Sequence, residues 1–122
     1  MADISYSIQA QVTKGALNQT LSASGVTANI STTGLIATTL NLGTAATQIT
    51  TTNLSSLGLC FARSLTTVET HVVTIGRLVS GTLHGAVSLR AGEAAVFRMA
   101  AGDYAAYAAV ANSRVVVQIT EG

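Results

Sequence analysis

The sequence predicts an all-β fold: a β-sandwich of jelly-roll type with about eight to ten short antiparallel strands. Three observations lead to this prediction. Thr, Val, Ile and Ser, which suit strands and turns, are abundant in the 122 residues, and proline and tryptophan are absent. Apolar and polar residues alternate along much of the chain, as expected for strands with one buried face. Single glycines separate the alternating runs at about the 8–12-residue spacing typical of sandwiches.

The clearest strand opens the chain. Apolar side chains occupy every second position of Ile4–Val12, and Ser and Gln fill the positions between them. Lys14-Gly15 then has the composition of a turn. We expect one sandwich domain over residues 1–122, in which residues 1–14 form an edge strand or are exchanged with a neighbouring copy.

Shorter alternating runs predict the next strands. Residues 17–24 form one run, Ser24-Gly25 has the composition of a turn, and residues 26–30 repeat the alternation. A Thr-rich run over residues 35–42 and a short strand over residues 48–51 follow.

The segment Leu57–Leu65 is the most densely apolar part of the chain, which indicates a central strand buried on both faces. We therefore expect Phe61 in the core, where its replacement by alanine would cost about 3–5 kcal/mol. Cys60 lies in the same segment and is expected to be a buried, unreactive thiol rather than a nucleophile.

The second half of the chain predicts four more strands, over residues 68–79, 82–89, 94–100 and 115–120. Within the first of them, Gly76 is a candidate interruption.

Residues 94–111 allow two interpretations. Alanine is abundant there, and Asp103 could cap a short helix that ends at Val110. Tyr104, Ala106 and Ala108 also alternate as in a strand. We favour the strand because the neighbouring segments are strands.

Charge excludes several classes of protein. Only 9% of residues are charged, the net charge is +1 and Lys14 is the single lysine, so no basic stripe for nucleic acid exists. No segment has the length and hydrophobicity of a membrane span, and MADISYSIQA does not resemble a signal peptide. A surface with so little charge suggests that much of it is covered by other subunits, so we expect a homo-oligomer.

No catalytic, metal or cofactor motif is recognisable. His71 and His84 with Cys60 do not form a set with zinc-ligand spacing, and we expect ordinary surface or interface histidines. Glu93 follows Gly92 in a predicted turn, where hydrogen bonds to backbone amides are expected rather than catalysis. The sequence therefore predicts no enzyme, no bound metal and no cofactor.

The five arginines all lie in the second half of the chain, each among apolar neighbours. Arginine suits ion pairs at interfaces, and a cluster that binds a carboxylate or a sugar is the alternative.

The order of these segments resembles a family of small tailed-bacteriophage structural proteins. The N-terminal amphipathic strand before Lys14-Gly15 and the Leu-Gly-Leu run that leads into Phe61-Ala62-Arg63 match its layout. Ser64-Leu65 departs from the Asn-Leu that is usual there. The Leu-x-x-Gly-Glu turn at residues 89–93 and the apolar C-terminal strand with an acidic end also fit.

The resemblance implies a jelly-roll-like virion protein, with a capsid decoration (cement) protein that binds between capsomers and stabilises the shell as the expected type. Its partners would be copies of itself, expected as a trimer, and a major capsid protein, with neither nucleic acid nor membrane bound. It would be assembled in the host cytoplasm and reside on the capsid surface.

The alternative is a β-sandwich module of the tail, neck or fibre that binds a partner protein or carbohydrate. The residues expected at interfaces are Ile4, Tyr6, Ile8, Tyr104 and Tyr107.

Overall fold

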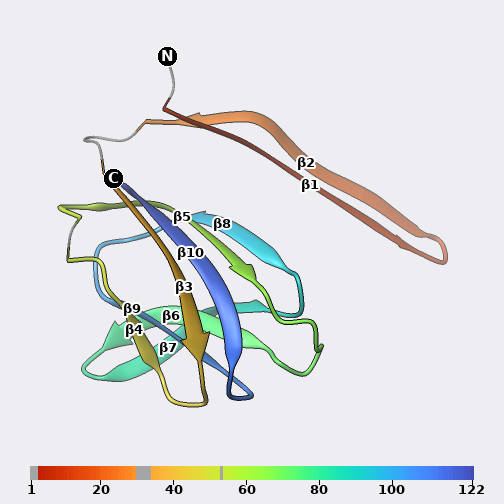
Figure 1. Ribbon diagram of the computed structural model, residues 1–122. Coiled ribbons are helices and arrows are strands. Elements are labelled where there is room, and N and C mark those ends of the chain that lie inside the picture. Colours follow the sequence, from red (N-terminus) through yellow and green to blue (C-terminus); the bar gives the residue numbers. More distant parts are fainter. Residues whose placement is uncertain (1–2, 30–33, 53) are drawn as a thin grey trace. The chain divides into compact units, whose positions relative to one another are not determined.

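The computed structural model describes residues 3–29, 34–52 and 54–122, and every regular element among them is a β-strand (Figure 1). All strand pairs are antiparallel, which confirms the predicted all-β class. The chain divides into two compact units, Met1–Ser31 and Thr32–Gly122, where the sequence predicted one domain. The strands are β1 Ile4–Lys14, β2 Leu17–Ala28, β3 Leu35–Leu42, β4 Thr47–Ile49, β5 Leu57–Ser64, β6 Val73–Val79, β7 Thr82–Leu89, β8 Ala94–Arg98, β9 Tyr104–Ala108 and β10 Ser113–Glu121.

The first unit is a two-stranded hairpin of β1 and β2. The two strands are connected by the two-residue turn Gly15-Ala16. Gly15 has a φ of 57°, and a positive φ is what the first central position of such hairpin turns requires. Of the segment 1–14 expected as a strand, Ile4–Lys14 forms β1, and its partner is β2.

A β-bulge makes β2 one continuous strand where the sequence predicted a turn. Between the pairs Tyr6–Val26 and Ile8–Ala23, β1 has one residue and β2 has two, Ser24 and Gly25. Gly25 has a φ of 65°, which glycine adopts without strain. The end of the predicted run at Ile30 lies outside the described residues.

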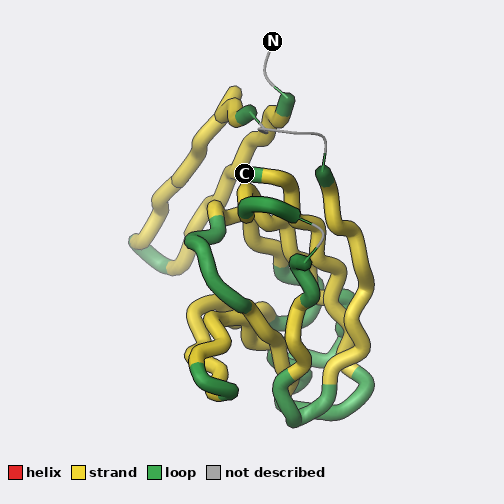
Figure 2. Tube along the Cα trace, turned by 90° about the vertical axis from the view of Figure 1, so that its left-hand side faces the viewer, coloured by secondary structure: helices red, strands yellow, loops and turns green. Residues whose placement is uncertain are grey.

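The second unit contains two four-stranded sheets, in the orders β3-β10-β5-β8 and β4-β9-β6-β7 (Figures 1 and 2). Counted within this unit, the first strand pairs with the eighth (β3–β10) and the second with the seventh (β4–β9). The third pairs with the sixth (β5–β8) and the fourth with the fifth (β6–β7). The eight strands are thus paired as one long hairpin whose successive strand pairs alternate between the two sheets.

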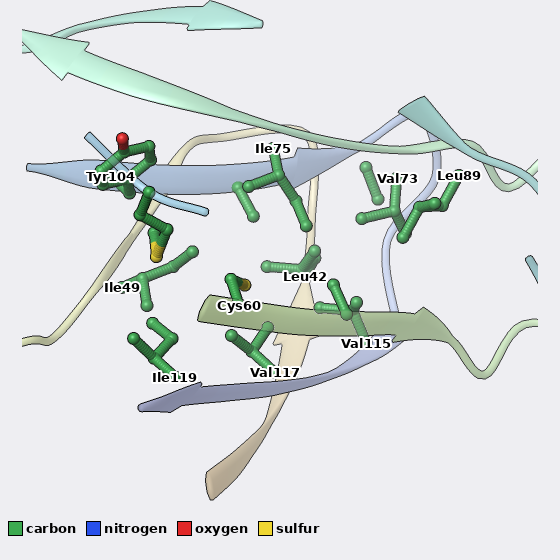
Figure 3. Close-up of a cluster of buried hydrophobic side chains, with 14 residues drawn as sticks. Leu42, Ile49, Cys60, Val73, Ile75, Leu89, Tyr104, Val115, Val117 and Ile119 are labelled. Atoms are coloured by element: carbon green, nitrogen blue, oxygen red, sulfur yellow. The ribbon is translucent and has the colours of Figure 1, made fainter. Parts of the chain in front are cut away.

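The core lies between the two sheets, and its side chains point from both toward a common interior (Figure 3). Alternate residues of β10 supply its centre: Val115, Val117 and Ile119 are fully buried. Ile75 on β6 and Cys60 on β5 meet them from the two sheets. Small residues such as Ala62 and Ala106 complete the interior, and of the aromatic residues Tyr104 belongs to it and Phe97 packs against it.

Strand β5 departs from its prediction of burial on both faces. Cys60, Ala62 and Ser64 are buried, but Phe61 is 40% exposed and Arg63 is exposed. The strand has one core face and one outward face because its sheet is covered on one side within this unit. The expectation that Phe61 is a core residue is therefore wrong.

The other differences are local. Strand β6 begins at Val73, so residues 68–72 precede it as a connection, and Gly76 continues the strand. The strand interpretation of the alanine-rich segment is confirmed as two strands, β8 and β9. The turn at Arg90–Glu93 forms as predicted, with Gly92 at a φ of 73° and Glu93 accepting a hydrogen bond from the backbone N–H of Arg90 at 2.6 Å.

Glu121 fastens the end of β10 to the segment before β5. Its Oε1 accepts hydrogen bonds from the backbone N–H groups of Ser55 and Ser56, each at 2.9 Å, and from the Ser55 hydroxyl. The Ser55 hydroxyl, followed by these backbone donors, lowers the pKa of Glu121, although burial of the carboxyl opposes the shift.

The core assignment predicts unequal effects of two truncations. Ile119→Ala removes a fully buried side chain and is expected to lower the free energy of unfolding by about 2–5 kcal/mol. Phe61→Ala is expected to cost about 1 kcal/mol, since the ring keeps much of its water contact. Urea unfolding of both variants measures the difference, and equal losses would contradict the placement of Phe61.

The carboxylate of Glu121 predicts a pH dependence of stability. Because its pKa is lower in the folded chain, its contribution is present above the ordinary value of 4.5 and is lost as the pH falls through the lowered pKa. Thermal unfolding between neutral pH and pH 3 should show a loss of stability that is smaller in Glu121→Gln. An identical pH profile for the two proteins would show that this carboxylate does not contribute.

Candidate functional site

The hairpin unit has one apolar face and one polar face. The cross-strand register places Ile4 opposite Ala28, Tyr6 opposite Val26, and Ile8 opposite Ala23. Directly paired residues share a face, so these side chains form one surface, which Ala10, Leu21 and Val12 continue. We call this surface the apolar hairpin face: Ile4, Tyr6, Ile8, Ala10, Val12, Leu21, Ala23, Val26 and Ala28.

The bulge keeps this face continuous. Apolar residues occupy odd positions in β2 up to Ala23 and even positions from Val26 onward. Without an extra residue between them, the period of two would turn Val26 and Ala28 to the opposite face. The bulge at Ser24 and Gly25 supplies that residue, and the Gly25 N–H lies 3.5 Å from the Ser7 hydroxyl across the strands.

Among residues 3–29, nothing within the hairpin unit covers the apolar face. Ile8 is 45% exposed and Leu21 is 60% exposed, whereas Ile4 and Tyr6 are half-buried. The opposite face consists of Ser, Thr, Gln and Asn side chains, so a hydrophobic core on that side is excluded. An isolated two-stranded hairpin is at best marginally stable in water, and the unit therefore requires a packing partner.

Large and small residues alternate across the apolar hairpin face. Ile8 is paired with Ala23, and Leu21 is paired with Ala10, so each large side chain stands beside a small one. A hollow of about 330 Å³ lies over these four residues. When large side chains stand beside small ones, the large side chains of one copy can pack over the small ones of another, so two like faces can interdigitate.

The interface candidates from the sequence separate into two groups. Ile4, Tyr6 and Ile8 are brought together on the apolar hairpin face. Tyr104 and Tyr107 belong to β9, three residues apart, and point to opposite sides of the sheet: Tyr104 is only 7% exposed and Tyr107 is at the surface. Tyr104 is therefore not an exposed interface side chain.

Sequence reasoning omitted Val12 and Leu21 from the candidates although both are exposed and apolar. Their alternation with polar residues was visible. It does not distinguish a face turned to the core of the same chain from one turned outward, because both produce a period of two.

A second surface is the outward face of the sheet β3-β10-β5-β8. Phe61 lies near its centre, opposite Gln118 on one side and Val96 on the other. Arg63, Arg98 and Arg114 are exposed around it, and the only acidic residue in these four strands, Glu121, is buried. Aromatic and arginine side chains are the residues that interfaces favour.

Residues considered for chemistry lie apart. Cys60 is buried between the sheets, and desolvation raises the pKa of its thiol to about 12, so the reactive thiolate is strongly disfavoured. His71 lies in the connection before β6, and His84 lies on β7. Within the residues that the structure describes, no group of three or more His, Cys, Asp or Glu could hold a metal ion.

Comparison with known protein families, curated proteins and solved structures finds no match for this chain. The described residues also contain no helix that is long and apolar enough to span a membrane.

The burial of Cys60 predicts that its thiol resists modification in the folded protein. At pH 8, a thiol reagent such as DTNB should react with the folded protein at a small fraction of the rate at which it reacts with the urea-unfolded chain. The reason is that folding suppresses both access to the thiol and its ionisation. Absorbance at the release of thionitrobenzoate measures the rate. Equal rates for the folded and unfolded chain would place the thiol at the surface.

Proposed function

We propose that this protein is a structural, non-enzymatic component of a tailed-bacteriophage virion, a capsid decoration protein that assembles as a homotrimer. The observation that carries the proposal is the apolar hairpin face, which nothing in the described part of the hairpin unit covers and which has Lys14 at the end of the same side. Exposed apolar surfaces of this kind mark sites of protein association.

The strand order supports the same proposal. Eight strands in two sheets, paired first with eighth through fourth with fifth, follow the plan of a jelly roll, and we assign the sandwich unit to that fold. Jelly rolls occur in viral capsid proteins as well as in lectins and cupins, so the fold is compatible with the function without defining it.

The size of the apolar hairpin face favours more than two copies. Strands of this length span about 36 Å, and two of them are about 10 Å wide, so the face covers about 350 Å². A standard interface takes about 800 Å² from each partner. Three faces around a common apolar centre add contacts between neighbouring hairpins, so each copy contributes more than its face alone.

The outward face around Phe61 is the surface that we propose for the shell. Its three arginines have no carboxylate partner within the described part of the chain, and the major capsid protein would supply acidic groups opposite them. Binding between capsomers would then add interface free energy to the shell. We propose that neither nucleic acid nor membrane is a partner.

The carbohydrate alternative receives less support. Sugar rings stack on exposed aromatic side chains, and of the two tyrosines of β9 only Tyr107 is at the surface.

Assembly through the apolar hairpin face predicts a specific response to charge. Ile8→Glu with Leu21→Glu places two carboxylates in the proposed interface and should convert the trimer to a monomer, because buried unpaired charges are strongly disfavoured. Sedimentation velocity over a concentration series distinguishes a particle of three times 12.3 kDa from a single chain.

The matched control is Gln9→Glu with Ser22→Glu, a cross-strand pair on the polar face of the same hairpin. It adds the same charge to the same strands and should leave the trimer intact. A monomeric wild-type protein, or equal dissociation of both double variants, would overturn the assembly proposal. Absence of the protein from purified particles of the virus that encodes it, by mass spectrometry and cryo-electron microscopy, would overturn the virion assignment.

A further inference from the structure

A cavity of about 280 Å³ lies within the sandwich unit, where β8 of one sheet approaches β6, β7 and β9 of the other. Apolar side chains including Ile75, Val87 and Phe97 form its walls. Arg77 and Arg98 are the two charged residues that border it. An apolar cavity bordered by a few polar groups is the usual form of a small-molecule site.

The strand period directs Arg77 toward this cavity. In β6, Val73 and Ile75 point into the core, and Arg77 is the next residue on the same face. Its guanidinium carbon lies 5.7 Å from the centre of the Tyr104 ring, within the range of a cation–π contact. Tyr104 is itself held by a 2.8 Å hydrogen bond from its hydroxyl to the carbonyl oxygen of Ala100.

Gly102 makes room for the guanidinium. A Cβ atom at Gly102 would lie 2.3 Å from one Arg77 terminal nitrogen and 2.7 Å from its Nε. Gly102 also has a φ of 139°, which side-chain-bearing residues rarely adopt. The Arg77 side chain is thus fixed between the backbone at Gly102 and the Tyr104 ring rather than extended into solvent.

One donor of the fixed guanidinium, the Arg77 Nε–H, has no acceptor within the described part of the chain. This nitrogen is buried from solvent. Asp103, which lies between Gly102 and Tyr104, uses its backbone carbonyl oxygen to accept a hydrogen bond from Leu78, and its carboxylate makes no ion pair with Arg77. A buried donor left without an acceptor costs free energy that a bound anion would recover.

We propose that this cavity binds a small carboxylate with an apolar tail, the carboxylate on Arg77 and the tail against Ile75, Val87 and Phe97. The planar guanidinium of Arg77 matches a carboxylate through two parallel hydrogen bonds. A cavity of about 150 Å³ already binds benzene in another protein, so this one has room for a tail of several carbons. The inference depends on the sandwich unit alone and is independent of the proposed virion role.

Two sources could supply such a group: a free carboxylic acid or the C-terminal carboxylate of an apolar peptide. The full chain labelled with ¹⁵N is titrated with octanoate, and separately with the tripeptide Gly-Gly-Leu, while the Arg77 Nε–H signal and the backbone signals are followed by NMR. 1-Octanol and the amidated tripeptide are the uncharged matches. We expect a carboxylate to cause saturable chemical-shift changes at Arg77. Its uncharged match should bind at least about tenfold more weakly.

Octanoate binding identifies a free acid as the ligand type, and binding of the tripeptide alone identifies a chain terminus. Arg77→Gln should weaken either interaction by about tenfold or more, whereas Arg90→Gln, the same change at an exposed turn, should not alter it. If Arg77→Gln does not fold, the proposal is tested by comparing the binding of charged and uncharged ligands to the wild-type protein. No saturable shift with either carboxylate, or equal binding of the uncharged matches, would overturn the proposal.

Discussion

The burial of alternate side chains on β10 is the constraint on which the sandwich depends. This strand lies between β3 and β5, so one segment near the C-terminus joins two segments that precede it by more than fifty residues. Its inward residues Val115, Val117 and Ile119 are fully buried and contact the opposite sheet through the shared core. Glu121 then holds the end of the strand to Ser55 and Ser56. Most of the long-range order of this unit therefore follows from the placement of β10.

Small side chains set the character of this core. With only five aromatic residues in the chain, the interior is filled by Val, Ile, Leu and Ala, and Ala62 and Ala106 are fully buried. Polar positions are consequently few, and those that occur have defined roles: Glu121 closes the strand end, and Arg77 borders a cavity. The low charge of the sequence thus reflects two things, an interior with few ionic groups and an exposed surface rich in hydroxyl and apolar side chains.

The hairpin unit has the same composition with a different consequence. Its apolar side chains cannot form a core of their own, because two strands enclose no interior. The alternation that builds a core between two sheets in one unit creates an exposed face in the other. This contrast is the physical basis for the proposed assembly, since the apolar hairpin face is stabilised only when another surface removes it from water.

The sequence by itself determined the class of fold and nearly every strand, because a period of two is a local property that each segment expresses alone. It also determined the turn at Arg90–Glu93 and the burial of Cys60. Only the tertiary structure decided which side of each strand is covered. Phe61 and Cys60 are neighbours in one apolar segment, yet only Cys60 faces the second sheet. Tyr104 is buried and Tyr107 exposed for the same reason, and Arg77 meets Tyr104 and Gly102 only because β6 and β9 pair. Such contacts depend on strand partners distant in sequence, which alternation cannot specify.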